Sequence, residues 1–83
     1  MPTANTHDFT ELRDYVGSDG KRLTRREHQI IAMMAWGYSD KVIADYLNST
    51  TKAVQMVIVK IHRRYGWTRR QMASYYAKEI GLI

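Results

Sequence analysis

Cysteine is absent from the 83-residue sequence, which excludes disulfide bonds and thiolate metal sites and fits a reducing cytoplasm. Long hydrophobic runs are absent as well. The longest unbroken apolar stretches cover residues 30–36 and 56–59, whereas a membrane-spanning helix needs about 20 such residues. Residues 1–8 contain no basic region followed by an apolar segment, so a signal peptide is not expected either. We therefore expect a cytoplasmic protein without a membrane segment.

The side chains that catalysis or metal binding requires are also scarce. The three histidines, His7, His28 and His62, are scattered, and none has a second ligand at metal-binding spacing. The sequence shows no nucleophile–base arrangement and no glycine-rich phosphate loop. We therefore expect neither an enzyme nor a metal or cofactor site.

Acidic residues are missing from the most basic part of the chain. The formal net charge is +5, yet residues 1–20 carry four acidic side chains against one arginine. Residues 46–78 contain no acidic side chain and seven basic ones, namely Lys52, Lys60, Arg63, Arg64, Arg69, Arg70 and Lys78. A solvated helix face normally mixes both signs of charge. An acid-free stretch of this length therefore indicates a polyanionic partner.

The length of the chain allows one domain with one modest core. We place this domain at residues 21–83, after residues 1–20, which combine an N-terminal tail (1–6) with a short acidic helix. That helix is expected over residues 8–16 and should stop at Gly17. Its apolar side would consist of Phe9, Leu12, Tyr15 and Val16. Residues 17–20, Gly-Ser-Asp-Gly, predict a turn.

The first strong helix is predicted over residues 24–36. Thr24 and Glu27 form a capping-box pattern, in which each side chain binds a backbone N–H at the helix start. Leu23 occupies the position of a hydrophobic staple, and Gly37 is the expected C-terminal stop. An apolar stripe at helical spacing follows: Ile30, Ile31, Met34 and Ala35.

Three further helices are predicted, which makes the fold class all-α. Ser39 caps a short helix over residues 40–47, whose inner side would hold Val42, Ile43, Tyr46 and Leu47. Thr50 caps a third helix over residues 51–65, which ends at Gly66. Thr68 and Gln71 form a second capping box for a fourth helix that runs to Ile80 and stops at Gly81. The β-branched residues of the third helix favour strand, but their spacing is helical.

The third helix is predicted to have an apolar face and a basic face. The inward positions are Val54, Val57, Ile58, Ile61 and Tyr65, and the outward positions are Lys52, Gln55, Met56, Val59, Lys60 and Arg63. In a DNA major groove, Gln55 could pair with adenine, while Met56 and Val59 could pack only against thymine methyls or sugar carbons. The side chains placed to contact phosphates are Lys60, Arg63 and Arg64, with Lys41, Thr50, Thr51 and Lys52 around the turn.

These residues resemble the LuxR/GerE-type helix-turn-helix of bacterial transcription regulators. The resemblance spans residues 23–73 without insertion or deletion. The matching residues are Leu23, Thr24, Arg26, Glu27, Ala35, Gly37, Ser39, Lys41, Ile43, Ala44, Leu47, Val54, Ile61, Gly66, Arg70 and Ala73. The resemblance implies a four-helix domain, here with a short extra N-terminal helix, and is closest to stand-alone members that lack a receiver or ligand-binding domain. It further implies a cytoplasmic, nucleoid-associated protein whose third helix contacts double-stranded DNA and whose fourth supports a homodimer on an inverted repeat.

A dimer interface is predicted on the fourth helix, because that helix carries two apolar faces and a single domain needs only one. The interface would consist of Met72, Tyr75, Tyr76 and Glu79, while Ala73, Ala77 and Ile80 would face the core. Trp36, Tyr38 and Trp67 are expected to pack over helix junctions. Arg26 and Glu27 could contact DNA, but a buried structural pair is the favoured expectation.

Two functions remain open. The favoured one is a sequence-specific DNA-binding transcription regulator. The alternative is a protein-interaction module, an anti-activator that pairs with a larger LuxR-type regulator through its fourth helix; RNA polymerase is another candidate partner. The family usually has a hydroxyl residue at Ala53 and a histidine at Val57. Fewer side chains of this third helix can therefore hydrogen-bond to bases than in typical members. The acidic N-terminal segment could also mimic nucleic acid or mask the basic face.

Overall fold

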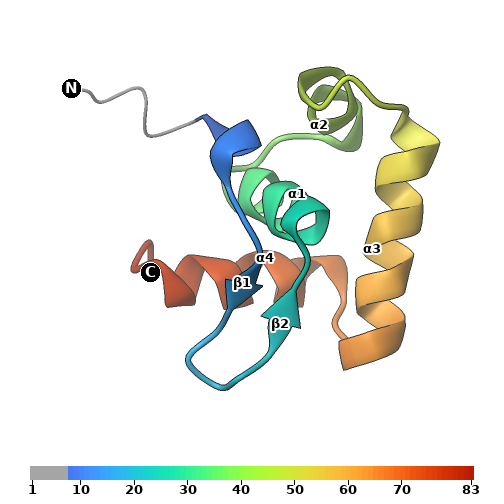
Figure 1. Ribbon diagram of the computed structural model, residues 1–83. Coiled ribbons are helices and arrows are strands. Elements are labelled where there is room, and N and C mark those ends of the chain that lie inside the picture. Colours follow the sequence, from blue (N-terminus) through green and yellow to red (C-terminus); the bar gives the residue numbers. More distant parts are fainter. Residues whose placement is uncertain (1–7) are drawn as a thin grey trace.

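The computed structural model describes residues 8–83, so the predicted tail over residues 1–6 lies outside the described residues. The elements in chain order are a 3-10 helix η2 (Phe9–Glu11), strands β1 (Tyr15–Val16) and β2 (Arg22–Leu23), and helices α1 (Arg25–Ala35), α2 (Asp40–Tyr46), α3 (Thr51–Tyr65) and α4 (Arg69–Glu79). Figure 1 shows α1 in the middle of the molecule, with α2 above it, α3 along one side and α4 beneath. The mostly helical fold confirms the predicted class.

Side-chain caps begin the four α-helices, as the sequence predicts. The Thr24 hydroxyl accepts the Glu27 N–H at 3.3 Å, and the Glu27 carboxylate accepts the Thr24 N–H at 2.9 Å. Thr68 and Gln71 form the same capping box at the start of α4. Because these bonds join residues only three positions apart, they depend on local sequence alone. The cap hydroxyls of α2 and α3 belong to Ser39 and Thr50.

The core lies between α1 and the helices around it. Its largest fully buried side chains are Leu23, Ile30, Ile31, Met33, Ile43, Val54, Ile61 and Met72. The prediction for α2 is partly wrong, because Val42 and Tyr46 are 47% and 41% exposed. A seven-residue helix turns only one narrow stripe inward, and Ile43 with Ala44 fills it. Tyr46 instead packs edge-on against Phe9, and its hydroxyl accepts the Phe9 N–H at 3.2 Å.

The predicted helix over residues 8–16 is wrong in extent. Only Phe9–Glu11 is helical, and Tyr15–Val16 forms a strand that pairs antiparallel with Arg22–Leu23. The predicted turn at residues 17–20 closes this hairpin, with the Gly20 N–H donating to the Gly17 carbonyl at 2.9 Å. Strand alternation leaves Tyr15 half-buried and Val16 56% exposed, whereas a helix would have placed both on one side.

Candidate nucleic-acid interface

The outer face of α3 consists of the side chains that the sequence predicts. Lys52, Gln55, Met56, Val59, Lys60 and Arg63 are all exposed, and Val54, Ile58 and Ile61 on the opposite face are buried. Val57 and Tyr65, also predicted inward, are half-buried. Figure 1 shows α3 at one edge of the molecule, where no other element covers its outer side. A regular helix with this exposed surface has the shape that a DNA major groove admits.

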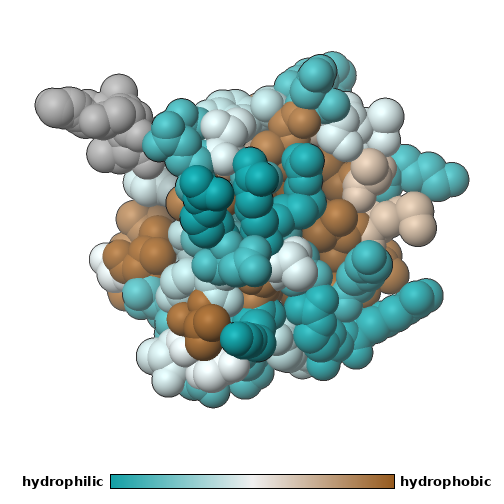
Figure 2. Space-filling model, in the orientation of Figure 1, coloured by the Kyte–Doolittle hydropathy of each residue, from teal (hydrophilic) through white to brown (hydrophobic). Residues whose placement is uncertain are grey.

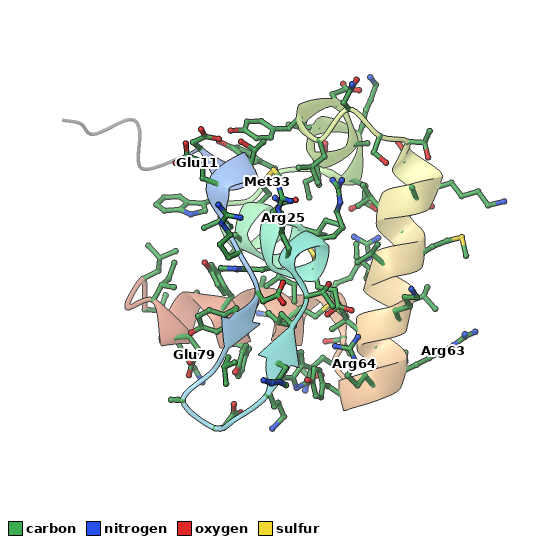
Figure 3. The ribbon with its side chains drawn as sticks, viewed as in Figure 1. Glu11, Arg25, Met33, Arg63, Arg64 and Glu79 are labelled. Carbon is green, nitrogen blue, oxygen red and sulfur yellow. The ribbon has the colours of Figure 1, made fainter. Side chains whose placement is uncertain are left out.

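Arg64 requires a correction, because it serves the fold. Figure 3 shows Arg63 extending away from α3, whereas Arg64 lies on the side of α3 that faces α1 and β2. The Arg64 guanidinium donates to both carboxylate oxygens of Glu27, one of them at 2.9 Å, and also to the Arg22 carbonyl at 3.3 Å. The predicted Arg26–Glu27 pair is therefore wrong, since Glu27 pairs with Arg64. This bidentate ion pair joins α3 to the start of α1 and occupies guanidinium donors that the sequence predicts at phosphate.

The charge state of this pair follows from its surroundings. Glu27 is 4% exposed, and burial favours its neutral form. The hydrogen bonds from Arg64 and from the Thr24 N–H outweigh burial and hold the pKa of Glu27 below its usual value. The same carboxylate raises the pKa of Arg64, so both groups are charged at neutral pH.

A second ion pair joins the start of α4 to the start of α2. Arg69, the first residue of α4, donates to both oxygens of Asp40, the first residue of α2, at 2.8 and 2.6 Å. The hydrogen bonds from Arg69 hold the pKa of Asp40 below its usual range. The Gln55 side-chain amide of α3 donates to the same carboxylate at 3.3 Å. Three helices thus meet at one acidic group, a contact that no local sequence pattern indicates.

The predicted DNA contacts around the turn before α3 differ in their exposure and in the partners they already have. Lys41 is exposed and forms an i,i+4 pair with Asp45 at 3.5 Å. The Thr50 hydroxyl accepts the Ala53 N–H at 3.1 Å, so it already serves as the α3 cap. Thr51 is half-buried and Lys52 is exposed. The predicted contacts of these residues with DNA stay predictions.

Two arginines lie at the start of α1, and neither is among the DNA contacts predicted from the sequence, where Arg26 is assigned to a structural pair instead. Arg25 and Arg26 line a hollow of about 420 Å³ between α1 and the end of α2. Arg26 also lines a second hollow of about 560 Å³ with Val57, Lys60 and Arg63 of α3. Figure 2 shows hydrophilic side chains over the start of α1 and beside α3 in this view. The two adjacent arginines within the capping box are visible in the sequence. Only the packing of the elements brings Arg26 beside Lys60 and Arg63 of α3.

The four residues predicted to form a dimer interface on α4 do not form a free surface: two are buried and two are half-buried. Met72 and Tyr76 are 0% and 5% exposed and belong to the chain's own core. Tyr75 packs on Trp67, with ring centroids 4.5 Å apart, and its hydroxyl donates to Asp19 at 2.9 Å. Glu79 accepts hydrogen bonds from Tyr15 and Ser18, and Figure 3 shows it beside the hairpin. The sequence predicts no hairpin and so leaves this face without a partner, whereas in the structure the hairpin covers it.

The side of α4 predicted to face the core does so except at the C-terminal end of the helix. Ala77 is buried and Ala73 half-buried, as expected, but Ile80 is 42% exposed. Ile80 is the C-cap of α4 and not part of its last turn. The helix therefore ends before this side chain can reach the core.

Within residues 8–83, no group of three histidine or acidic side chains is arranged to hold a metal ion. Among the same residues, no helix combines the length and the apolar character that crossing a membrane requires.

Comparisons with known proteins agree with the geometry. Neither the curated proteins nor the solved structures gave a match to the chain. The family model described as bacterial regulatory proteins, luxR family, matches residues 21–77, which include α1 to α3 and most of α4. This match covers well over half of the chain and coincides with the helix-turn-helix and its basic outer face. The chain therefore belongs to the luxR family of bacterial regulatory proteins, a family of DNA-binding transcription regulators.

Proposed function

We propose that the protein is a sequence-specific regulator of transcription that inserts α3 into the major groove of double-stranded DNA. The observation that carries this proposal is the charge arrangement around α3. Two acidic groups bond to side chains of α3, Glu27 to Arg64 and Asp40 to Gln55, and each is held by an arginine of the same chain. Within residues 8–83, Lys52, Lys60 and Arg63 form no ion pair, so these cations remain available to a polyanion.

We assign some side chains on and around the outer face of α3 to base contacts and others to phosphate contacts. Gln55 has the bidentate geometry that pairs with adenine, and Met56 and Val59 can contact thymine methyls. The side chains proposed for phosphates are Lys41, Thr50, Thr51, Lys52, Lys60 and Arg63. Arg25 and Arg26 extend this basic surface across the start of α1. Arg64 is removed from the set, since its guanidinium is bound to Glu27.

A homodimer on an inverted repeat is part of the proposal and needs a different interface. The exposed side chains that remain at the end of α4 and beyond it include Lys78, Ile80, Leu82 and Ile83. A two-fold contact there would be isologous and would set the spacing of the two α3 helices. We place this activity at the bacterial nucleoid, in the cytoplasm.

The second candidate function is that of an anti-activator, which binds a larger LuxR-type regulator or RNA polymerase. The observation that favours it is the exposure of Met56 and Val59, which are 60% and 45% exposed on the outer face of α3. Exposed apolar side chains on a regular helix also suit a protein partner.

A salt titration separates the two functions. The purified protein is titrated against a labelled mixed-sequence duplex at several salt concentrations. If a dimer neutralises about six to ten phosphates, the slope of log affinity against log salt should lie near −5 to −9. Absence of binding at low salt, or affinity that does not change with salt, would contradict DNA binding and leave the anti-activator function.

A further inference from the structure

The side chain of Gln55 is held by a residue of another helix, although it lies on the exposed face of α3. Its amide nitrogen donates to Asp40 Oδ2 at 3.3 Å, and the Arg69 guanidinium donates to both oxygens of that carboxylate. The Asp40 side chain is only 18% exposed, whereas that of Arg69 is 51% exposed. Gln55 therefore projects from α3 with one end of its amide anchored.

The chemistry of the anchor determines which way the amide turns. An ionised carboxylate accepts hydrogen bonds and donates none, and Arg69 holds the pKa of Asp40 low, so Asp40 stays ionised near neutral pH. Gln55 must consequently direct its NH₂ group, and not its oxygen, toward Asp40. A bidentate contact with adenine needs the amide oxygen for the N6 amino group and one N–H for N7. The second N–H remains for Asp40, so both contacts can exist together.

We propose that Asp40, fixed by Arg69, is a positioning residue that orients the Gln55 amide and thereby selects adenine over guanine at the base that Gln55 contacts. This inference rests on the proposed function, because it concerns how α3 distinguishes bases. Guanine presents two acceptors, O6 and N7, where adenine presents one donor and one acceptor. An amide oxygen held outward faces the adenine amino group favourably and the guanine oxygen unfavourably.

Asp40→Asn tests the orientation with little change in shape. Asparagine has a single carboxamide oxygen, and the Arg69 guanidinium, which only donates, should bind it. The new NH₂ group then faces Gln55, which must turn its own oxygen inward and its NH₂ group outward. We expect the preference for adenine over guanine to fall by about tenfold, the scale of one bidentate base contact.

The chain offers a matched control on the same helix. Asp45→Asn makes the same charge change, and Asp45 is exposed and bonded to Lys41 instead of α3. A duplex preferred by the wild type is first selected from random sequences, and Gln55→Ala identifies the base pair that depends on Gln55. Fluorescence anisotropy at fixed salt then gives the affinity ratio for A·T over G·C at that pair. The ratio is measured for the wild type, Asp40→Asn, Asp45→Asn, Gln55→Ala and the double variant Asp40→Asn/Gln55→Ala.

The expected result is a reduced ratio in Asp40→Asn, an unchanged ratio in Asp45→Asn, and no further effect of Asp40→Asn when Gln55 is already alanine. An unchanged ratio in Asp40→Asn, an equal loss in Asp45→Asn, or a loss that persists without Gln55 overturns the inference. Thermal melting shows whether each variant folds. If Asp40→Asn does not, Arg69→Gln leaves the carboxylate in place and should give a smaller loss of the same preference; an unchanged ratio there overturns the inference. A wild type that binds no duplex at low salt overturns the proposed function as well.

Discussion

Replacing Arg64 by alanine should destabilise the fold, whereas replacing its neighbour Arg63 should not. Arg64 joins α3 to α1 through Glu27, which is 4% exposed and also caps α1. Without Arg64, the Glu27 carboxylate is left buried with no cation. Arg63 is exposed and points away from the protein (Figure 3), so its removal should leave the core packing in place.

The magnitude follows from the burial of the two partners. Removing one member of a fully buried pair costs about 3–5 kcal/mol. Arg64 is 40% exposed, so solvent screens the pair, and fully exposed pairs contribute about 0–1 kcal/mol. We expect an intermediate loss of about 2 kcal/mol in the free energy of unfolding. In a domain of this size, that loss lowers the melting temperature by about 8–16 °C.

The pH dependence of the same pair gives an independent check. The pKa of Glu27 is lowered in the folded protein from its usual 4.5. The pair therefore contributes stability above pH 4.5, and that contribution is lost as the pH falls through the lowered value. The difference in unfolding free energy between wild type and Arg64→Ala should be full at pH 7 and should shrink in acid.

Circular dichroism melting at several pH values measures these changes, with Arg63→Ala as the matched control. The control should melt within a few degrees of the wild type while binding DNA more weakly. If Arg64→Ala melts like the wild type but loses affinity for DNA, Arg64 is a phosphate contact and does not stabilise the fold through Glu27. A difference that stays constant from pH 7 into acid would exclude Glu27 as its partner.

Three further predictions concern the cap, the basic face and the hairpin. Thr24→Ala removes a helix cap and should cost about 0.5–2 kcal/mol; an unchanged melting curve would show that this cap contributes nothing. Lys60→Ala should weaken binding to every duplex alike and reduce the salt slope by about 1, so an unaltered slope would place Lys60 outside the interface. Tyr75→Glu should lower the melting temperature even at dilute protein concentration, because it breaks the contacts with Trp67 and Asp19; a change seen only in self-association would instead restore Tyr75 to a dimer interface.

The sequence alone determined where the four α-helices begin and which side of α3 is exposed. Caps such as Thr24 with Glu27 join residues three positions apart, and Gly66 at φ 73° ends α3 in a conformation that glycine adopts freely. The two faces of α3 follow from a helical period of 3.6 residues. These signals depend on neighbours along the chain and survive without knowledge of the fold. They also sufficed to indicate the family.

Only the tertiary structure decided what each side chain contacts, including side chains that the sequence predicts to be exposed. Arg63 and Arg64 are adjacent in sequence and chemically identical, yet one faces solvent and the other meets Glu27, 37 residues away. Tyr75 and Glu79 resembled a free face until the hairpin covered them, and Gln55 gained its anchor because α2 and α4 bring Asp40 and Arg69 beside it. Sequence spacing specifies the direction of a side chain on its own helix. The partner in that direction depends on how separate elements pack, which no local pattern encodes.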